Sequence, residues 1–146
     1  MASTESMRTS ILAIAAVMLA VLLGSFATAG AATPDQAKQV SVTIEMSKDF
    51  TFVPQTANVA AGTLVVFHNS ASMPHDAIVD PQNTAKGGPN SDAAYPNGVP
   101  AGQSYSWSVP ANAVKGTKWF YHCRFHGVAG DGTSLGTGMV GVIIVN

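Results

Sequence analysis

The chain has 146 residues, with seven Lys or Arg residues, eight Asp or Glu residues and a formal net charge of −1. This length is enough for one domain with its own hydrophobic core. The near-zero charge argues against a protein that attracts nucleic acid or an anionic membrane. The single cysteine excludes an internal disulfide.

Residues 1–31 carry the parts of a secretory signal peptide in the usual order. Arg8 supplies a basic start, and the apolar run at 11–23 is short for a membrane span. Small residues follow, and both 27–29 and 29–31 fit an A-x-A cleavage pattern. We therefore expect cleavage and export, to the periplasm or the outer face of the cytoplasmic membrane, with no integral membrane span in the mature form. An uncleaved N-terminal anchor is the alternative.

Residues 32–39 are expected to form a polar linker, and residues 40–146 show the pattern of an all-β domain. Apolar and polar side chains alternate over 40–46, which is typical of a strand with one buried face. Further strands or extended runs are expected at 50–54, 64–68, 77–79, 104–109, 117–121 and 140–145. Residues 80–103 are rich in Pro, Gly, Asn and Ala and predict a long irregular connection. Without a sustained helical period, this order of elements predicts a Greek-key β-sandwich.

Cys123 is the residue around which the candidate chemistry gathers. An unpaired thiol in an exported protein needs a partner chain or a metal, unless it is a buried thiol without a function. His126 lies three residues further on, and Met139 precedes the last strand. One thiolate, one imidazole and one thioether are typical of a mononuclear copper site, which takes two imidazoles in all.

The second imidazole has to come from elsewhere in the chain. His75 is the better candidate, because Pro74 and Asp76 place it at the junction of a loop and a strand, where a rigid backbone can aim a ligand. His68 falls inside a strand pattern and is the other candidate. The sequence therefore favours a site built from His75, Cys123 and His126.

Residues 42–145 resemble the cupredoxins, and within them the plastocyanin-like blue copper proteins. The residues that carry this resemblance are Phe52-x-Pro54, Val59, Gly62, Val65, Phe67, Asn69, Pro74-His75, Tyr105 to Trp107, Trp119-Phe120-Tyr121, Cys123-x-x-His126 and Gly138-Met139-Val140-Gly141. The resemblance implies a cupredoxin domain over 40–146 with one type 1 copper ion. It also implies that His75, Cys123, His126 and Met139 are the copper ligands.

The resemblance implies a small electron carrier, not an enzyme. Such a monomer would exchange single electrons with a donor and an acceptor redox protein through transient contacts. In the family the loop histidine reaches an apolar surface patch where partners dock. Here the loop histidine is His126, and Met73, Pro74, Phe125 and Val128 are the candidate patch residues.

The sequence departs from the family pattern at two places. His126 and Met139 are 13 positions apart (139 − 126), much further than in plastocyanin-like loops, because of a glycine-rich insert at 128–138. Met139 is still favoured as the axial ligand, with Leu135 or an open axial position as alternatives. Asp76 stands where the family usually has asparagine, and an ionised aspartate cannot donate a hydrogen bond. We expect Asp76 to add negative charge near the copper and to lower its reduction potential relative to Asp76→Asn.

Other functions fit parts of the same pattern. The ligand set would also serve a periplasmic protein that binds and carries copper. The Tyr121-His122-Cys123 string resembles copper nitrite reductases, in which the corresponding histidine binds a second copper. Strand alternation places His122 and Cys123 on opposite faces, which favours an outer-face histidine instead. A binding sandwich without a metal is the remaining alternative.

Overall fold

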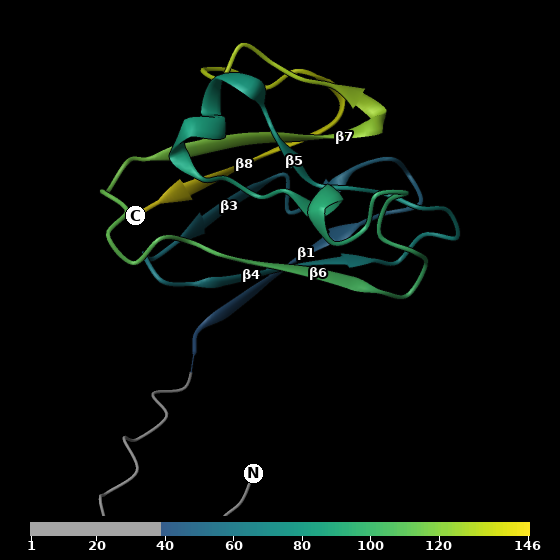
Figure 1. Cartoon of the computed structure of the whole chain (residues 1–146), viewed down its shortest axis with the longest axis horizontal. Coiled ribbons are helices and arrows are strands. Elements are labelled where there is room, and N and C mark those ends of the chain that lie inside the picture. Colours follow the sequence, from purple (N-terminus) through teal and green to yellow (C-terminus); the bar gives the residue numbers. More distant parts are fainter. Residues whose placement is uncertain (1–38) are drawn as a thin grey trace, which may run out of the picture. The chain divides into compact units, whose positions relative to one another are not determined.

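The computed structural model describes residues 39–146, so the predicted signal peptide and nearly all of the predicted linker lie outside the described residues. The domain is a sandwich of two four-stranded sheets (Figure 1). One sheet has the order β2-β1-β4-β6, with bounds Phe52–Val53, Ser41–Met46, Leu64–Asn69 and Ser104–Ser108. The other has the order β3-β8-β7-β5, with bounds Thr56–Val59, Thr137–Val145, Lys118–Val128 and Ile78–Val79. The predicted all-β sandwich is confirmed.

The core lies between the two sheets and is rich in aromatic side chains. Tyr121 of β7 meets Phe52 and Phe67 of the other sheet edge to face, with ring centroids 4.8 and 5.3 Å apart. All three are buried, and burying a phenylalanine side chain such as Phe52 or Phe67 contributes about 1.5–3 kcal/mol. The alternation predicted for the first strand places Ile44 and Met46 in the same core. This packing gives the rigid base on which the loops at one end are carried.

The segment between β5 and β6 is more ordered than the sequence predicts. It contains two short 3-10 helices, η1 (Pro81–Lys86) and η2 (Ser91–Ala93). Trp119 and Trp107, one from each sheet, meet edge to face at 5.1 Å. Their indole N–H groups donate to the carbonyl oxygens of Lys86 and Gly87, each at 3.1 Å. The end of η1 is therefore bonded to both sheets. Neither helix, nor any other helix within 39–146, is long and apolar enough to span a membrane.

The β7–β8 hairpin is longer than predicted and is interrupted once. The strands pair from Lys118 with Ile144 to His122 with Val140, and they pair again where Gly127 faces Gly138. Between these stretches the register shifts, and residues 123–126 of β7 lie opposite Met139. The glycine-rich insert is thus an extension of the hairpin beyond the Gly127–Gly138 pair.

The tip of this extension, residues 129–136, packs against η1. Asp80 accepts a hydrogen bond from the Gly130 N–H at 2.8 Å. The side-chain amide of Asn83 donates to the Gly132 carbonyl at 3.1 Å. Both Asp80 and Asn83 are buried. In Figure 1 the tip lies beside η1, above the β5–β7 sheet.

Candidate metal centre

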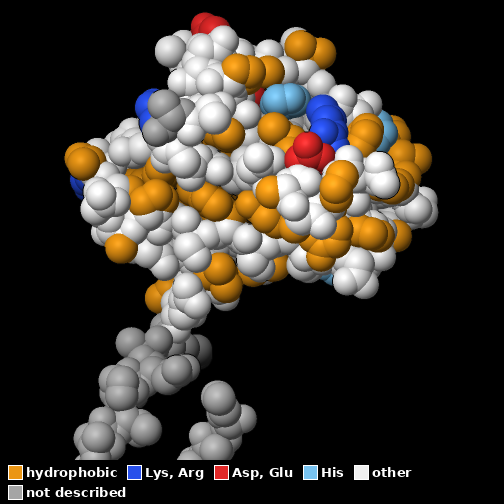
Figure 2. Space-filling model, viewed as in Figure 1, with side chains coloured by type: hydrophobic (Ala, Val, Ile, Leu, Met, Phe, Trp, Pro, Cys, Tyr) orange, Lys and Arg blue, Asp and Glu red, His pale blue; other side chains and the backbone are white. Residues whose placement is uncertain are grey.

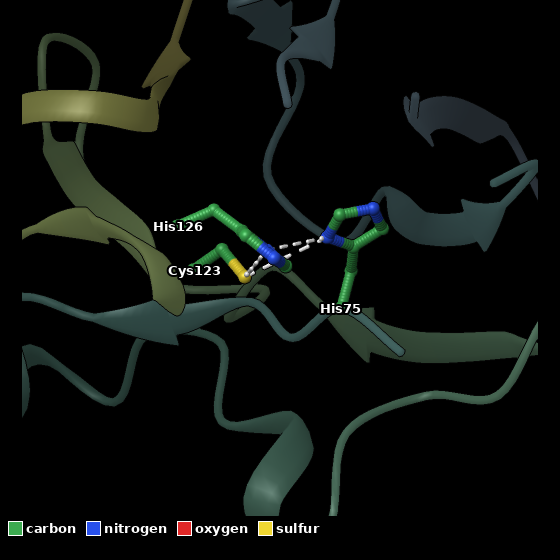
Figure 3. A group of neighbouring side chains, drawn as sticks. All are labelled: His75, Cys123 and His126. Atoms are coloured by element: carbon green, nitrogen blue, oxygen red, sulfur yellow. Dashed lines mark hydrogen bonds between the residues drawn. The ribbon is translucent and has the colours of Figure 1, made fainter. Parts of the chain in front are cut away.

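Three of the four predicted ligands converge at one end of the sandwich. Cys123 and His126 come from the interrupted part of β7, and His75 comes from the connection between β4 and β5. The Cys123 sulfur lies 3.5 Å from His126 Nδ1 and 3.8 Å from His75 Nδ1, and the two Nδ1 atoms are 3.1 Å apart (Figure 3). His75 and Cys123 are buried, while His126 is partly exposed. The three donor atoms therefore face a common point.

The backbone around His75 is held by an asparagine whose role sequence reasoning missed. His75 and Val99 exchange backbone hydrogen bonds, with N–O distances of 3.3 and 2.6 Å. The buried Asn69 donates to the carbonyls of Met73 and Val99, both at 2.8 Å, and accepts from the Ala71 N–H at 2.9 Å. A polar residue at an inward-facing position of β4 was the available signal, because such a group has to find partners.

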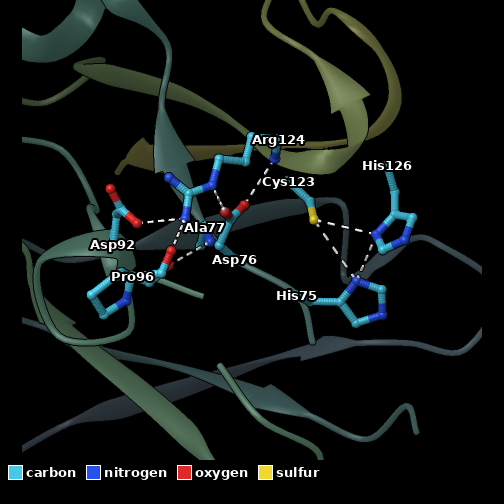
Figure 4. Close-up of polar contacts among 9 residues, drawn as sticks. His75, Asp76, Ala77, Asp92, Pro96, Cys123, Arg124 and His126 are labelled. Atoms are coloured by element: carbon cyan, nitrogen blue, oxygen red, sulfur yellow. Dashed lines mark hydrogen bonds and ion pairs between the residues drawn. The ribbon is translucent and has the colours of Figure 1, made fainter. Parts of the chain in front are cut away.

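A second link joins the two segments that carry the donors. Asp76, directly after His75, is buried and accepts a hydrogen bond from the backbone N–H of Arg124 at 2.8 Å. Its other oxygen lies 2.8 Å from Arg124 Nε in an ionic contact (Figure 4). Arg124 directly follows Cys123. Sequence reasoning singled out Asp76 but missed Arg124. The available signal was a pair of opposite charges in the sequence, one directly after His75 and one directly after Cys123.

Burial shifts the pKa values of several groups at this site. It raises the pKa of the Cys123 thiol and, with the nearby His126, lowers the pKa of His75. Burial also raises the pKa of Asp76, against the opposing effects of the Arg124 N–H and guanidinium. The Nδ1 atoms of His75 and His126 face each other, and of two facing neutral imidazole nitrogens at most one can donate. A metal ion between the two Nδ1 atoms and the Cys123 sulfur could accept an electron pair from each of them. The three atoms cannot all pair with one another in this way.

The spacing of the donors fits a metal ion in a trigonal plane. Metal–nitrogen bonds of about 2.0–2.1 Å and metal–sulfur bonds of about 2.3 Å, set about 120° apart, separate two nitrogens by roughly 3.5 Å and nitrogen from sulfur by roughly 3.8 Å. The corresponding distances here are 3.1 Å between the nitrogens, and 3.5 and 3.8 Å from sulfur to nitrogen. Two imidazoles and a thiolate in this arrangement are the donor set of an electron-transfer copper site.

Met139 lies across from the donor-bearing part of β7 and is buried. Its backbone packs so closely on Gly127 that a Cβ atom there would collide with it. The alternative Leu135 lies in the tip of the hairpin, where 37% of it is exposed. Asp131 is in the tip too, and its carboxylate accepts hydrogen bonds from Thr133 and Ser134.

The two remaining histidines lie outside this group. His68 Nδ1 is 3.0 Å from the Ser104 hydroxyl, on β4 and β6. His122 is mostly buried, and its Nδ1 lies 2.9 Å from an Asp80 oxygen. His122 is thus paired and not an open surface side chain. Within residues 39–146, His75, Cys123 and His126 are the only three His, Cys or acidic side chains close enough together to hold a metal.

The exposed edge of His126 opens into an apolar surface depression. Its lining is Met73, Pro74, Asn97, Phe125 and His126. Met73 and Phe125, two of the residues predicted for the docking patch, are exposed. Val128 is exposed as well but is not part of the lining. Sequence reasoning missed Phe50, whose ring centroid lies 4.5 Å from that of His126.

Comparisons with known proteins give the family. The family model for copper binding proteins of the plastocyanin/azurin family matches residues 38–146. Plastocyanin from Vicia faba is 34% identical over 99 residues, which cover 65% of this chain and 87% of that protein. Chloroplastic plastocyanin from Chlamydomonas reinhardtii is 32% identical over 116 residues, covering 75% and 70%. The chloroplastic plastocyanin from Pisum sativum is 35% identical, and the match spans about half of it, 51%.

Among solved structures, a reduced amicyanin variant is 18% identical with a TM-score of 0.46, covering 73% of this chain and 82% of that one. A copper-containing nitrite reductase from Thermus scotoductus is 22% identical with a TM-score of 0.46, covering 73% and 22%. These structural likenesses are too distant to add to the argument. The family model and the plastocyanin sequences do decide the matter: the chain belongs to the plastocyanin/azurin family of copper-binding proteins, the cupredoxins.

Proposed function

We propose that this protein is a small exported blue copper protein that carries single electrons between redox partners. Its one type 1 copper ion would be held by His75, Cys123, His126 and Met139. The observation that carries this proposal is the convergence of two imidazole nitrogens and one sulfur at trigonal spacing. Bound copper supplies a couple between Cu(I) and Cu(II), for which thiolate and imidazole are suitable ligands.

The surroundings of the donors support electron transfer because they limit rearrangement. Hydrogen bonds from Asn69 fix the loop before His75, and Asp76 joins that loop to the backbone after Cys123. Donor atoms held on packed, hydrogen-bonded segments keep their positions within a narrow range. A site that moves little when its charge changes suits an electron carrier more than a metal carrier, which has to open to release its ion.

Met139 is proposed as the weak axial ligand because of its register in β8. The Gly127–Gly138 pair brings the chain back beside the donor-bearing segment after the long insert. Met139 is the residue that follows this pair, and it is buried. A soft thioether at this position matches the weak axial donor of blue copper sites.

We propose His126 as the point where electrons enter or leave. Its exposed edge lies in the depression lined by Met73, Pro74 and Phe125, and redox encounters are small and transient. On the face drawn in Figure 2, the few charged side chains lie scattered and form no large patch of one sign. The depression is lined by Met73, Pro74, Asn97, Phe125 and His126, and the formal net charge of the chain is −1. We expect apolar contact to govern docking and the transfer rate to depend weakly on salt.

The proposed chain organisation is a signal peptide at 1–31, a linker at 32–39 and the cupredoxin domain at 40–146. Export would place the protein in the periplasm or at the outer face of the cytoplasmic membrane, as a monomer. Mass spectrometry of the secreted protein tests cleavage after residue 31. A mature chain that retains residues 11–23 would support an N-terminal anchor instead.

The test of function is repeated reduction and oxidation of the copper-loaded protein with metal analysis after each cycle. An electron carrier keeps one copper per chain in both states. A copper that becomes exchangeable with a chelator on reduction would contradict the proposal and support copper carriage. Two coppers per chain would support an enzyme with a second site at His122. The Asp80 contact of His122 argues against that site.

A further inference from the structure

The residue after each of two proposed ligands is charged, and the two charges meet. Asp76 follows His75, and Arg124 follows Cys123. One Asp76 oxygen accepts the Arg124 backbone N–H at 2.8 Å, and the other lies 2.8 Å from Arg124 Nε. Asp76 is fully buried, while 36% of the Arg124 side chain is exposed. Arg124 therefore reaches in from the surface to a carboxylate beside the metal centre (Figure 4).

The same guanidinium also holds a third segment. Its terminal nitrogen donates to an Asp92 oxygen at 2.5 Å and to the Pro96 carbonyl at 2.6 Å. The segment from Asp92 to Pro96 leads into Val99, which exchanges backbone hydrogen bonds with His75. The planar fork of arginine presents donors in several fixed directions, whereas a lysine ammonium is a compact point charge. Arginine thus connects the two donor-bearing segments and the segment that supports them.

The burial of Asp76 makes this partner important. A buried carboxylate without a counter-charge is strongly destabilising, because it loses its hydration and gains nothing in return. The Arg124–Asp92 pair is different, since both side chains are substantially exposed and exposed ion pairs contribute little. The contact with Asp76 is therefore the one on which stability and electrostatics depend.

We propose that Arg124 is a positioning residue that locks the two ligand segments together and neutralises Asp76, so that the pair acts on the copper as a nearly neutral unit. The electrostatic half of this inference rests on the proposed function. The locking half concerns the copper-free fold and stands independently. The sign expected for Asp76→Asn stays as the sequence predicts it, whereas in the wild type the charge of Asp76 is compensated by that of Arg124.

The signs of the expected shifts follow from the charges. Arg124→Gln leaves a negative charge beside the copper, which stabilises Cu(II) and lowers the reduction potential. Asp76→Asn leaves a positive charge and raises the potential. The double variant removes both charges and returns the potential close to that of the wild type. Asp76→Asn keeps an oxygen that can accept the Arg124 N–H, so this hydrogen bond is retained.

The experiment compares the wild type with Arg124→Gln, Asp76→Asn, the double variant and Arg124→Lys, and Asp92→Asn is the matched control for the exposed pair. Voltammetry of the copper-loaded proteins gives the potentials, and urea unfolding of the copper-free proteins gives the stabilities. We expect opposite potential shifts in the first two variants and near-cancellation in the double variant. Arg124→Lys keeps the potential close to wild type but loses stability. Asp92→Asn changes neither quantity appreciably.

The copper-free unfolding data form a double-mutant cycle. We expect Arg124→Gln to have a much lower free energy of unfolding than the wild type. The double variant should lose less unfolding free energy than the two single variants lose together, because no unpaired buried charge remains in it. Additive losses would overturn the lock. Potential shifts of the same sign in both single variants, or none in Arg124→Gln, would overturn the charge compensation. Failure of the wild type to bind copper would refute the proposed function, while the unfolding cycle would still decide the lock.

Discussion

Gly127 lies directly opposite Gly138 across the β7–β8 hairpin, and this pair closes the loop that carries Cys123 and His126. At this pair the backbones of β7 and β8 approach too closely to leave room for a side chain. A Cβ atom on Gly127 would collide with the backbone of Met139, and one on Gly138 would collide with the carbonyl of His126. Gly138 also has a φ of +76°. A long sequence insert is thereby kept outside the ligand loop.

Gly127→Ala should therefore disturb both the fold and the copper site. We expect a loss of about 1–3 kcal/mol in unfolding free energy, the usual range for overpacking, together with altered EPR parameters because Met139 is displaced. Gly102→Ala is the control, since Gly102 has a φ of +72° and open space around it. That variant should lose stability through backbone strain alone. An unchanged EPR spectrum in Gly127→Ala would contradict the close approach.

Shortening the hairpin tests the position of the insert. Replacing residues 129–136 with Asn-Gly, which favours a tight two-residue turn, should leave the copper spectrum unchanged. Stability should fall by about 1–3 kcal/mol, because Asp80 and Asn83 are buried and lose their partners in the tip. Absorption spectra and urea unfolding measure the two effects. Loss of the copper band in the shortened protein would show that the tip belongs to the site.

Asn69→Ala should loosen the loop before His75. The substitution removes two donors and one acceptor from a buried position, and each buried group left unpaired costs about 1–3 kcal/mol. We expect lower stability and faster copper loss to a chelator. Asn97→Ala, at an exposed position, should have little effect on either. Equal behaviour of the two variants would refute the anchoring role of Asn69.

Copper binding should release a proton at neutral pH. The pKa of the Cys123 thiol is raised by burial, so the thiol is protonated, while the lowered pKa of His75 keeps that imidazole neutral. Copper binds the thiolate, so one proton leaves Cys123 and none leaves His75. Affinity should then rise with pH, by roughly tenfold per pH unit while the thiol remains protonated. Calorimetry in buffers with different ionisation enthalpies counts the protons. A count near zero would mean that Cys123 is already a thiolate.

The fold and three of the proposed ligands were accessible from the sequence for physical reasons. Period-2 alternation reports directly on strands with one buried face, and the lone cysteine near a histidine limits the possible chemistry. Local signals mark Asn69 and Arg124, but the partners of Asn69, Phe50 and Arg124 lie on distant segments, and no local pattern identifies those partners. The place of the 128–138 insert also follows from the pairing register of β7 and β8, which the sequence does not show. Only the pairing of Gly127 with Gly138 shows that the extra residues extend the hairpin and do not widen the ligand loop.

The absorption and EPR spectra of the copper-loaded protein, beside those of Cys123→Ser, test the copper–thiolate bond most directly. We expect an intense blue band and type 1 EPR parameters with one copper per chain, and the loss of both in Cys123→Ser, because both arise from the copper–thiolate bond. Met139→Gln should keep the blue band with altered EPR parameters, since only the axial donor changes. A colourless wild type, or a Cys123→Ser variant that keeps the blue band, would show that Cys123 does not bind copper as a thiolate.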